Sequence, residues 1–339
     1  MLPNYLSVSG KTRQNDLDVG FTISINPGAS TTSAGKQSAH QENRQAFLTF
    51  GDASWGSIKL GKDLGIYASD AILNDMTLLG VGSAAGSLAG NTTTLGRIGT
   101  GFMYADWKSQ VAYSSPNFGG FSFTVGLTQA FNADNSTARG EGSTAYEAKA
   151  SYAWEGDFAG KVWVSGITQK VEGLTNATSA TLNANGTTTA ATANTITDTS
   201  DRATAWDIGA NVNVAGLGLT AYYGDGKGIG QTLQLVGGFD STGKRRDSDQ
   251  WYVQATYALP GVGTKLGVSY GESTLDGNSV DTFDEIEDSM WVVGAYHPLT
   301  KHLNLVAEYS ESERDVDQAA GGSAKADAKT ISLGAILFF

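Results

Sequence analysis

The sequence predicts an all-β fold, a transmembrane antiparallel β-barrel that forms a single domain over residues 1–339. Apolar and polar residues alternate along segments of about ten residues, which is the length of a tilted strand that crosses a bilayer. Short and long connections between these segments also alternate along the chain. No apolar run approaches the roughly 18 residues that a membrane helix needs.

Residues 250–259 show the period of two most clearly. Trp251, Val253 and Ala255 form an apolar face, and Gln250 and Gln254 lie on the opposite, polar face. The same pattern recurs at 19–25, 121–128, 206–214, 303–309 and 331–339. A soluble β-sandwich would also alternate, but its strands average nearer 5–6 residues. A β-helix would show a fixed short repeat, which we do not find in this sequence.

The connections sort into two kinds. Short ones lie at 14–17, 51–54, 116–120, 155–159, 215–216, 260–263 and 299–301. Long polar ones lie at 28–41, 63–96, 132–143, 172–202, 226–247, 274–287 and 314–328. One end with tight turns and another with long loops is typical of outer-membrane barrels. Aromatic residues beside the short turns predict an interfacial girdle; they are Phe118, Phe121, Trp154, Phe158, Tyr257, Tyr296 and Phe338.

The number of predicted strands is odd. We count 15 between Tyr5 and Phe339, whereas bacterial single-chain barrels have even numbers. We therefore expect a 16-stranded type whose first strand is missing, with an open edge before Tyr5. No signal peptide is visible at the start, which leaves a mature or truncated chain and a chain that is not exported as alternatives.

Composition excludes several function classes. Lys and Arg number 22 against 34 Asp and Glu, a formal charge of −12, so nucleic acid is not an expected partner, because phosphate binding needs a basic face. Without cysteine the chain has no disulfide or thiolate metal site. His40, His297 and His302 lack metal-binding spacing, and no nucleophile-elbow motif is present. We predict that the protein is not an enzyme and holds no cofactor.

Residues 43–62 (NRQAFLTFGDASWGSIKLGK) carry the most specific motif in the chain. This strand–turn–strand resembles the trimeric 16-stranded general diffusion porins of Gram-negative bacteria. Residues 113–121 (YSSPNFGGF) and the terminal Phe339 are similar to the same family. The resemblance implies a homotrimer in the bacterial outer membrane, in contact with outer-membrane lipids and lipopolysaccharide, that passes ions and small hydrophilic solutes. It also implies that residues 63–96 fold into the pore and that Phe339 is an assembly signal.

The resemblance also implies a charged pore constriction. The expected residues are Arg44, Arg97, Lys59 and Lys62 on the wall and Asp75, Asp70 and Asp63 from the loop. We expect Arg44 and Arg97 on membrane strands, where a lipid-facing arginine costs about 2–4 kcal/mol, so that they face Asp75 across a water-filled gap. Leu79 stands where enterobacterial members have a second loop carboxylate, so a less polarised constriction is expected. Arg13 and Arg139 are expected on the solvated rim.

An acidic segment follows residue 274. Asp281, Asp284, Glu285 and Glu287 offer the oxygen ligands that calcium prefers. Loosely bound Ca²⁺ could link them to lipopolysaccharide phosphates, and a solvated acidic loop is the alternative. For the whole chain, the alternatives to a general channel are a substrate-selective channel for sugars or organic anions, a plugged barrel used as an anchor or adhesin, and a barrel enzyme.

Overall fold

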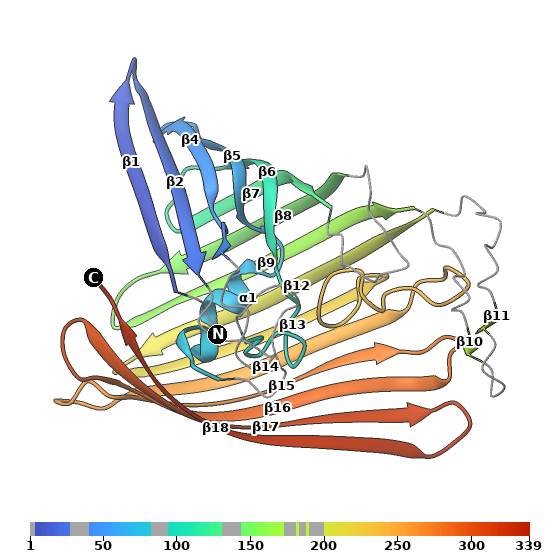
Figure 1. The fold of residues 1–339 in the computed structure, drawn as a ribbon. Coiled ribbons are helices and arrows are strands. Elements are labelled where there is room, and N and C mark those ends of the chain that lie inside the picture. The colour runs from blue at the N-terminus through green and yellow to red at the C-terminus, as the bar shows by residue number, and fades with distance from the viewer. Residues whose placement is uncertain are drawn as a thin grey trace.

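The computed structural model describes residues 4–27, 41–82, 94–130, 144–172, 181–182, 188–189 and 200–339. In these residues one large antiparallel sheet contains 15 strands in sequence order, with the short β3 beside β2. Figure 1 shows the sheet curling around the helix α1. The predicted all-β fold and its 15 strands are confirmed.

The strands of the sheet are β1 (Leu6–Gln14), β2 (Leu17–Pro27), β3 (Gln41–Glu42), β4 (Ala46–Asp52), β5 (Gly56–Leu64), β6 (Trp107–Ser114), β7 (Phe121–Gln129), β8 (Thr144–Trp154), β9 (Phe158–Val171), β12 (Asp201–Val214), β13 (Leu217–Lys227), β14 (Asp247–Ala258), β15 (Lys265–Asp276), β16 (Phe283–Pro298), β17 (Leu303–Gln318) and β18 (Ser323–Leu337). The short strands β10 (Thr181–Leu182) and β11 (Thr188–Thr189) pair with each other. Two short helices, α1 (Ser69–Asn74) and η1 (Met76–Leu79), follow β5. None of the helices in the described ranges is long and apolar enough to cross a membrane.

The edges of the sheet are β1 and β18. Within the described residues β1 pairs with β2, β18 pairs with β17, and no pairing joins β1 to β18. The expected open edge before Tyr5 is therefore present in the structure.

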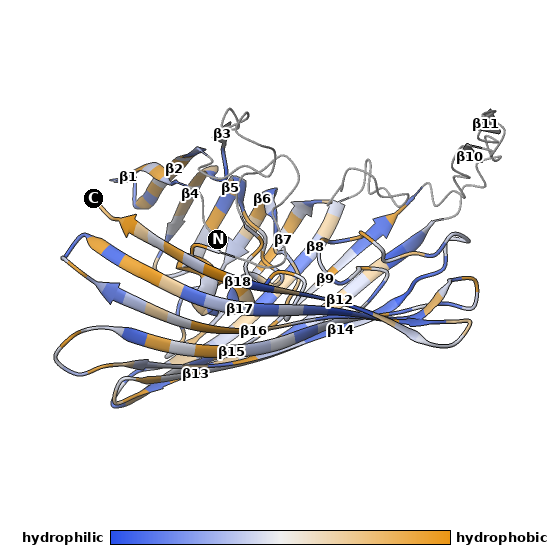
Figure 2. Ribbon diagram, turned by 60° about the horizontal axis from the view of Figure 1, so that its bottom comes forward, coloured by the Kyte–Doolittle hydropathy of each residue, from blue (hydrophilic) through white to orange (hydrophobic). Residues whose placement is uncertain are grey.

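The sheet exposes apolar side chains on its outer face and buries polar ones on its inner face, the reverse of a soluble protein. On β14, Val253 is 47% exposed, whereas Tyr252 on the opposite face is fully buried. Gln250 and Gln254 are buried on the same inner face as Tyr252. Figure 2 shows the alternation of hydrophobic and hydrophilic residues along the strands. An apolar outer face and a polar inner face suit a sheet with lipid outside and water inside.

Outward aromatic residues form two rows. Near the short turns, Trp154 stacks on Tyr152 and on Phe158, as the girdle prediction requires. Toward the long-loop ends, the outward pairs are Trp206–Tyr223, Trp251–Tyr270 and Trp291–Tyr309. Two aromatic rows are expected where a barrel crosses both interfaces. Tyr296 does not belong to the girdle: it is buried on the inner face and its hydroxyl donates to Glu308.

Turn chemistry explains the tight connections. Asn15 and Asp16 both have positive φ, 48° and 64°, as a two-residue hairpin turn of the favoured hand requires. Ala215 and Gly216 repeat this conformation with φ of 48° and 84°.

The predicted long loops at 274–287 and 314–328 are wrong, because the strands continue almost to the hairpin tips. Charged residues extend β17 and β18 by pairing across strands, as Lys325 does with Asp315 at 2.7 Å.

The assignment of faces gives a first prediction. Val268→Arg should lower the free energy of unfolding from the bilayer by about 2–4 kcal/mol, because Val268 lies on the outer face between the two aromatic rows and the arginine would face hydrocarbon at mid-depth. Asn211→Arg is the matched control, since Asn211 lies at similar height on the inner face, opposite Thr220. Urea titration of the protein folded into lipid vesicles measures the free energy of unfolding of both variants. Equal losses of stability in the two variants would contradict the assignment of the outer and inner faces.

Candidate functional site

After β5 the chain leaves the wall and crosses the inner face of the sheet. We call the described residues 65–82 and 94–106 the infolded loop. It contains α1 and η1 and ends where β6 begins at Trp107, later than the predicted end at residue 96. Figure 1 shows α1 within the curve of the sheet.

Two wall carboxylates hold the first part of the infolded loop at its two ends. Near its start, Glu147 Oε2 on β8 accepts hydrogen bonds from the backbone N–H groups of Ile66 and Tyr67, at 2.7 and 2.8 Å. At residues 81–82, Glu308 Oε2 on β17 accepts from the N–H groups of Val81 and Gly82, at 3.0 and 3.4 Å. Hydrogen bonds to charged acceptors stabilise more than neutral ones. The two carboxylates therefore fix both ends of this part of the loop, one to β8 and the other to β17.

Neutral side chains hold the middle of the infolded loop. Tyr252 Oη on β14 donates to the carbonyl of Ala71 at 2.9 Å. Gln254 on the same strand accepts from the N–H of Met76 at 2.7 Å and donates to the carbonyl of Asn74 at 3.0 Å. Strands remote in sequence therefore satisfy backbone groups that the short helices leave open.

Aromatic packing supports these hydrogen bonds. Ile72 and Phe102 of the infolded loop are buried against Trp163, Tyr222 and Tyr252 of the wall. Phe102 contacts Tyr252 with ring centroids 5.7 Å apart and Tyr222 at 6.5 Å. Burial of such large rings contributes on the order of 2–3 kcal/mol each relative to exposure.

Asp70 carries the clearest charge contact between loop and wall. It pairs with Lys149 on β8, at 3.0 Å, and with Lys161 on β9. Burial acts to raise the pKa of Asp70, but the two lysines outweigh it and hold the pKa below its ordinary value. Asp70 therefore stays ionised, and two cations meet one anion at this point.

The predicted gap between Arg97 and Asp75 is wrong. Arg97 lies in the infolded loop, not on a strand, and is fully buried; Nη1 donates to the carbonyls of Thr100 and Met290. Asp75 is inside the sheet as expected, but it is buried and accepts from the N–H and hydroxyl of Thr77. Burial excludes both from a water-filled passage.

The other predicted constriction residues have separate environments. Arg44 precedes β4 and is buried, with its guanidinium 5.5 Å from the Trp107 ring. Lys59 and Asp63 pair on the inner face of β5, so Asp63 belongs to the wall and not to the loop. Lys62 pairs with Ser109 on the outward face that Val111 also occupies. The prediction that Lys62 lines the pore is therefore wrong.

Several wall residues that hold the loop are not apparent as site residues in the sequence. Glu147, Lys149, Lys161, Gln254 and Glu308 contact the loop directly, and Lys108 and Asp207 support it through Glu147 and Ser165. The available signal was a charged residue at an inward position of an alternating strand, as Glu147 is between Tyr146 and Ala148. Such a residue must find a partner inside, because a lipid-facing charge is costly.

In the part of the chain that the structure describes, the side chains of the acidic segment are not gathered as a cation site would require. Asp281 is bonded by Arg246, whose Nε lies 2.8 Å from Oδ2, and this guanidinium holds the pKa of Asp281 below its ordinary value. Asp284, Glu285 and Glu287 belong to β16. Across the described ranges no group of three or more metal-ligating side chains comes together.

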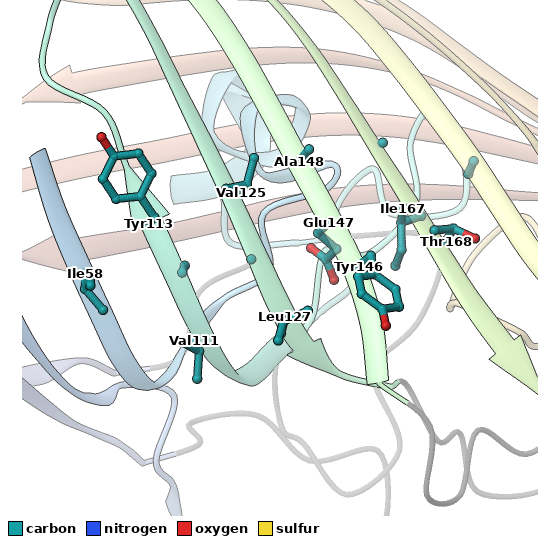
Figure 3. A pocket seen from close by; sticks show the side chains of 14 residues that line it. Ile58, Val111, Tyr113, Val125, Leu127, Tyr146, Glu147, Ala148, Ile167 and Thr168 are labelled. Atoms are coloured by element: carbon teal, nitrogen blue, oxygen red, sulfur yellow. The ribbon is translucent and has the colours of Figure 1, made fainter.

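A groove of about 660 Å³ lies on the outward face of β5–β9. Val111, Val125, Leu127 and Tyr146 line it (Figure 3). Because these apolar side chains face away from the infolded loop, the groove is not part of a solute path.

Comparisons with known proteins identify similar folds. The profile of the family described as Gram-negative porin matches residues 4–318. No curated protein matches the chain by sequence. The outer membrane channel DcaP of Acinetobacter baumannii is similar with a TM-score of 0.66 and 15% identity, over 99% of this chain and 85% of that chain. An anion-selective porin from Comamonas acidovorans is similar with a TM-score of 0.60 and 16% identity, over 98% of this chain and 89% of that chain. The trimer form of OmpT from Vibrio cholerae, folded in vitro, is similar with a TM-score of 0.56 and 15% identity, over 97% of this chain and 91% of that chain.

The buried Glu147 gives a second prediction. Glu147→Ala should lower the free energy of unfolding by about 3–5 kcal/mol, because Lys108, 2.7 Å away, becomes a buried charge without its counterion. The double variant Lys108→Met/Glu147→Gln removes both charges and keeps an acceptor for Ile66 and Tyr67, so it should lose less. Chemical unfolding in detergent or lipid compares them. A double variant as unstable as Glu147→Ala would show that the unpaired charge is not the cause.

Proposed function

Because the chain belongs to the Gram-negative porin family, whose profile matches residues 4–318, we propose that the infolded loop and the inner wall form the constriction of its channel. The protein lies in the bacterial outer membrane as a β-barrel and provides a water-filled path for passive diffusion of ions and small hydrophilic solutes.

The attachment of the infolded loop from Glu147 to Glu308 carries the proposal. These residues lie on β8 and β17, so the loop cannot leave the lumen without breaking charged hydrogen bonds at both ends. Gln254 and Tyr252 add contacts between them. A loop held in this way reduces the open cross-section and excludes large solutes, as a fixed constriction does.

The charges that solutes meet at this constriction are positive. The Asp70 side chain is 5% exposed, whereas Lys149 and Lys161 are 22% and 34% exposed. Two lysines share one carboxylate, so the site keeps a net positive charge despite the negative charge of the whole chain. We therefore propose a general channel with a weak preference for small anions.

The assembly belongs to the same proposal. We propose a homotrimer surrounded by outer-membrane lipids and lipopolysaccharide, without a catalytic role or a cofactor. The resemblance of residues 43–62 to trimeric porins supports this, as does the similar fold of OmpT in its trimer form. Calcium bridging by the acidic segment is not included, because Asp281 is bonded by Arg246.

Conductance across planar lipid bilayers tests the channel and the trimer together. Purified protein should give stepwise current increases at low protein concentration, and high voltage should close each inserted unit in three steps. A plugged barrel that serves as an anchor would give no current. Single-step closure with normal conductance would refute the trimer alone.

The charges give a further prediction. Asp70→Asn should shift the reversal potential in a salt gradient further toward anions, because two lysines then lack their counterion. Lys149→Gln/Lys161→Gln should shift it toward cations. Both shifts should shrink above about 0.1 M salt, where the Debye length falls below about 10 Å. Lys325→Gln, at an exposed pair between β17 and β18, is the control. Unchanged potentials in the first two variants would place selectivity elsewhere.

A further inference from the structure

A second connection also folds toward the lumen. We call residues 228–246, between β13 and β14, the second inner loop. They fall within the long polar connection that the sequence predicts at 226–247. In the structure Ile229, Leu235 and Phe239 are buried in one cluster with Tyr67 and Met103 of the infolded loop. Burying three large apolar side chains contributes on the order of 5–8 kcal/mol, which favours the inward position.

Hydrogen bonds join the two loops directly. Gln234 is fully buried; its Oε1 accepts from Lys108 Nζ at 2.7 Å and its Nε2 donates to the carbonyl of Tyr104 at 3.1 Å. The N–H of Tyr104 donates to the carbonyl of Thr232 at 3.0 Å. Lys108 also pairs with Glu147 at 2.7 Å. One polar network therefore connects the wall, the start and end of the infolded loop, and the second inner loop.

The two loops pack closely at Gly99, whose backbone lies against the side chain of Thr232. Gly99 has a φ of +79°, and a Cβ atom there would lie 2.5 Å from Oγ1 of Thr232. Glycine is required for both reasons: the left-handed conformation and the lack of space. Close packing of this kind leaves no room for solute between the loops.

The second inner loop is held by contacts within itself and by contacts to neighbouring hairpins. Arg246 donates to the carbonyls of Gly237 and Phe239, both at 2.8 Å, and pairs with Asp281. Gln231 Nε2 donates to Asp288 at 3.0 Å on β16. The loop is thus held at several points inside the sheet and not only by its contact with the infolded loop.

We propose that the second inner loop is a second constriction element that sets the size limit of the channel together with the infolded loop. It fills the space beside the outer halves of β8, β9 and β12, where Ala145, Ile167 and Ala203 pack in the same cluster. The inference rests on the channel function and adds the element that determines which solutes fit.

The test compares variants of the second inner loop by single-channel conductance and by swelling of proteoliposomes in sugars and polyethylene glycols of increasing size. Replacing residues 231–244 by a short Gly-Ser linker should raise conductance and shift the size limit toward larger solutes. Gln234→Ala should change both in the same direction by a smaller amount. Gln318→Ala, at an exposed position, is its control.

Gly99→Ala provides an independent variant with a matched control. It should loosen the contact with Thr232 and shift the size limit upward. Gly321→Ala introduces the same residue at a similar φ of +89°, where nothing lies within 4 Å, and should leave the size limit unchanged. Folding of each variant is checked by heat-dependent mobility on gels.

The outcomes separate this inference from the channel function itself. Folded linker and Gly99→Ala variants with the conductance and size limit of the unmodified protein would overturn the second constriction. Absence of current from the unmodified protein would instead overturn the channel.

Discussion

The structure depends on one constraint: in hydrocarbon, every backbone N–H and C=O group must be bonded within the protein. A sheet of 15 antiparallel strands in sequence order satisfies this requirement for every strand between the two edge strands, β1 and β18. Because successive side chains then point to opposite faces, the lipid-facing side must be apolar and the other side is free to be polar. The exposed Val253 and the buried Gln254 on one strand are the direct result.

The polar inner face is used to hold chain segments, and it is not simply a solvated surface. Glu147 is the centre of this arrangement. It binds the N–H groups of Ile66 and Tyr67, pairs with Lys108, and accepts from Thr128 at 2.7 Å. A buried carboxylate with four donors is well satisfied, and a buried ion pair gains from such additional hydrogen bonds. The polar face thereby positions two loops within the lumen.

Positioning the loops also decides which charges remain available to solutes. Arg97 and Asp75 are buried in the contact between loop and wall, so they contribute to structure. Lys149 and Lys161 share Asp70 and keep part of their surface in the lumen. The net positive charge of the passage therefore follows from the pairing of two lysines with a single aspartate.

The sequence by itself determined the features that depend on local geometry. Alternation with a period of two fixed the strands and the direction of residues such as Trp251, and Asn15–Asp16 fixed a hairpin turn. The order of the strands followed because consecutive strands pair through short connections. The membership of residues 65–82 in a long loop was also visible in the sequence.

Only the tertiary structure decided which charges meet and which loops lie inside. Glu147 is 81 residues from Ile66 in sequence, and Lys108 is 126 residues from Gln234. Such pairs form only when curvature of the sheet brings distant strands around the same space, and periodicity along one strand contains no information about that curvature. For the same reason Arg97 was expected on the wall and lies in the loop. The second inner loop looked polar because its large apolar buried residues, Ile229, Leu235 and Phe239, are few and follow no regular spacing.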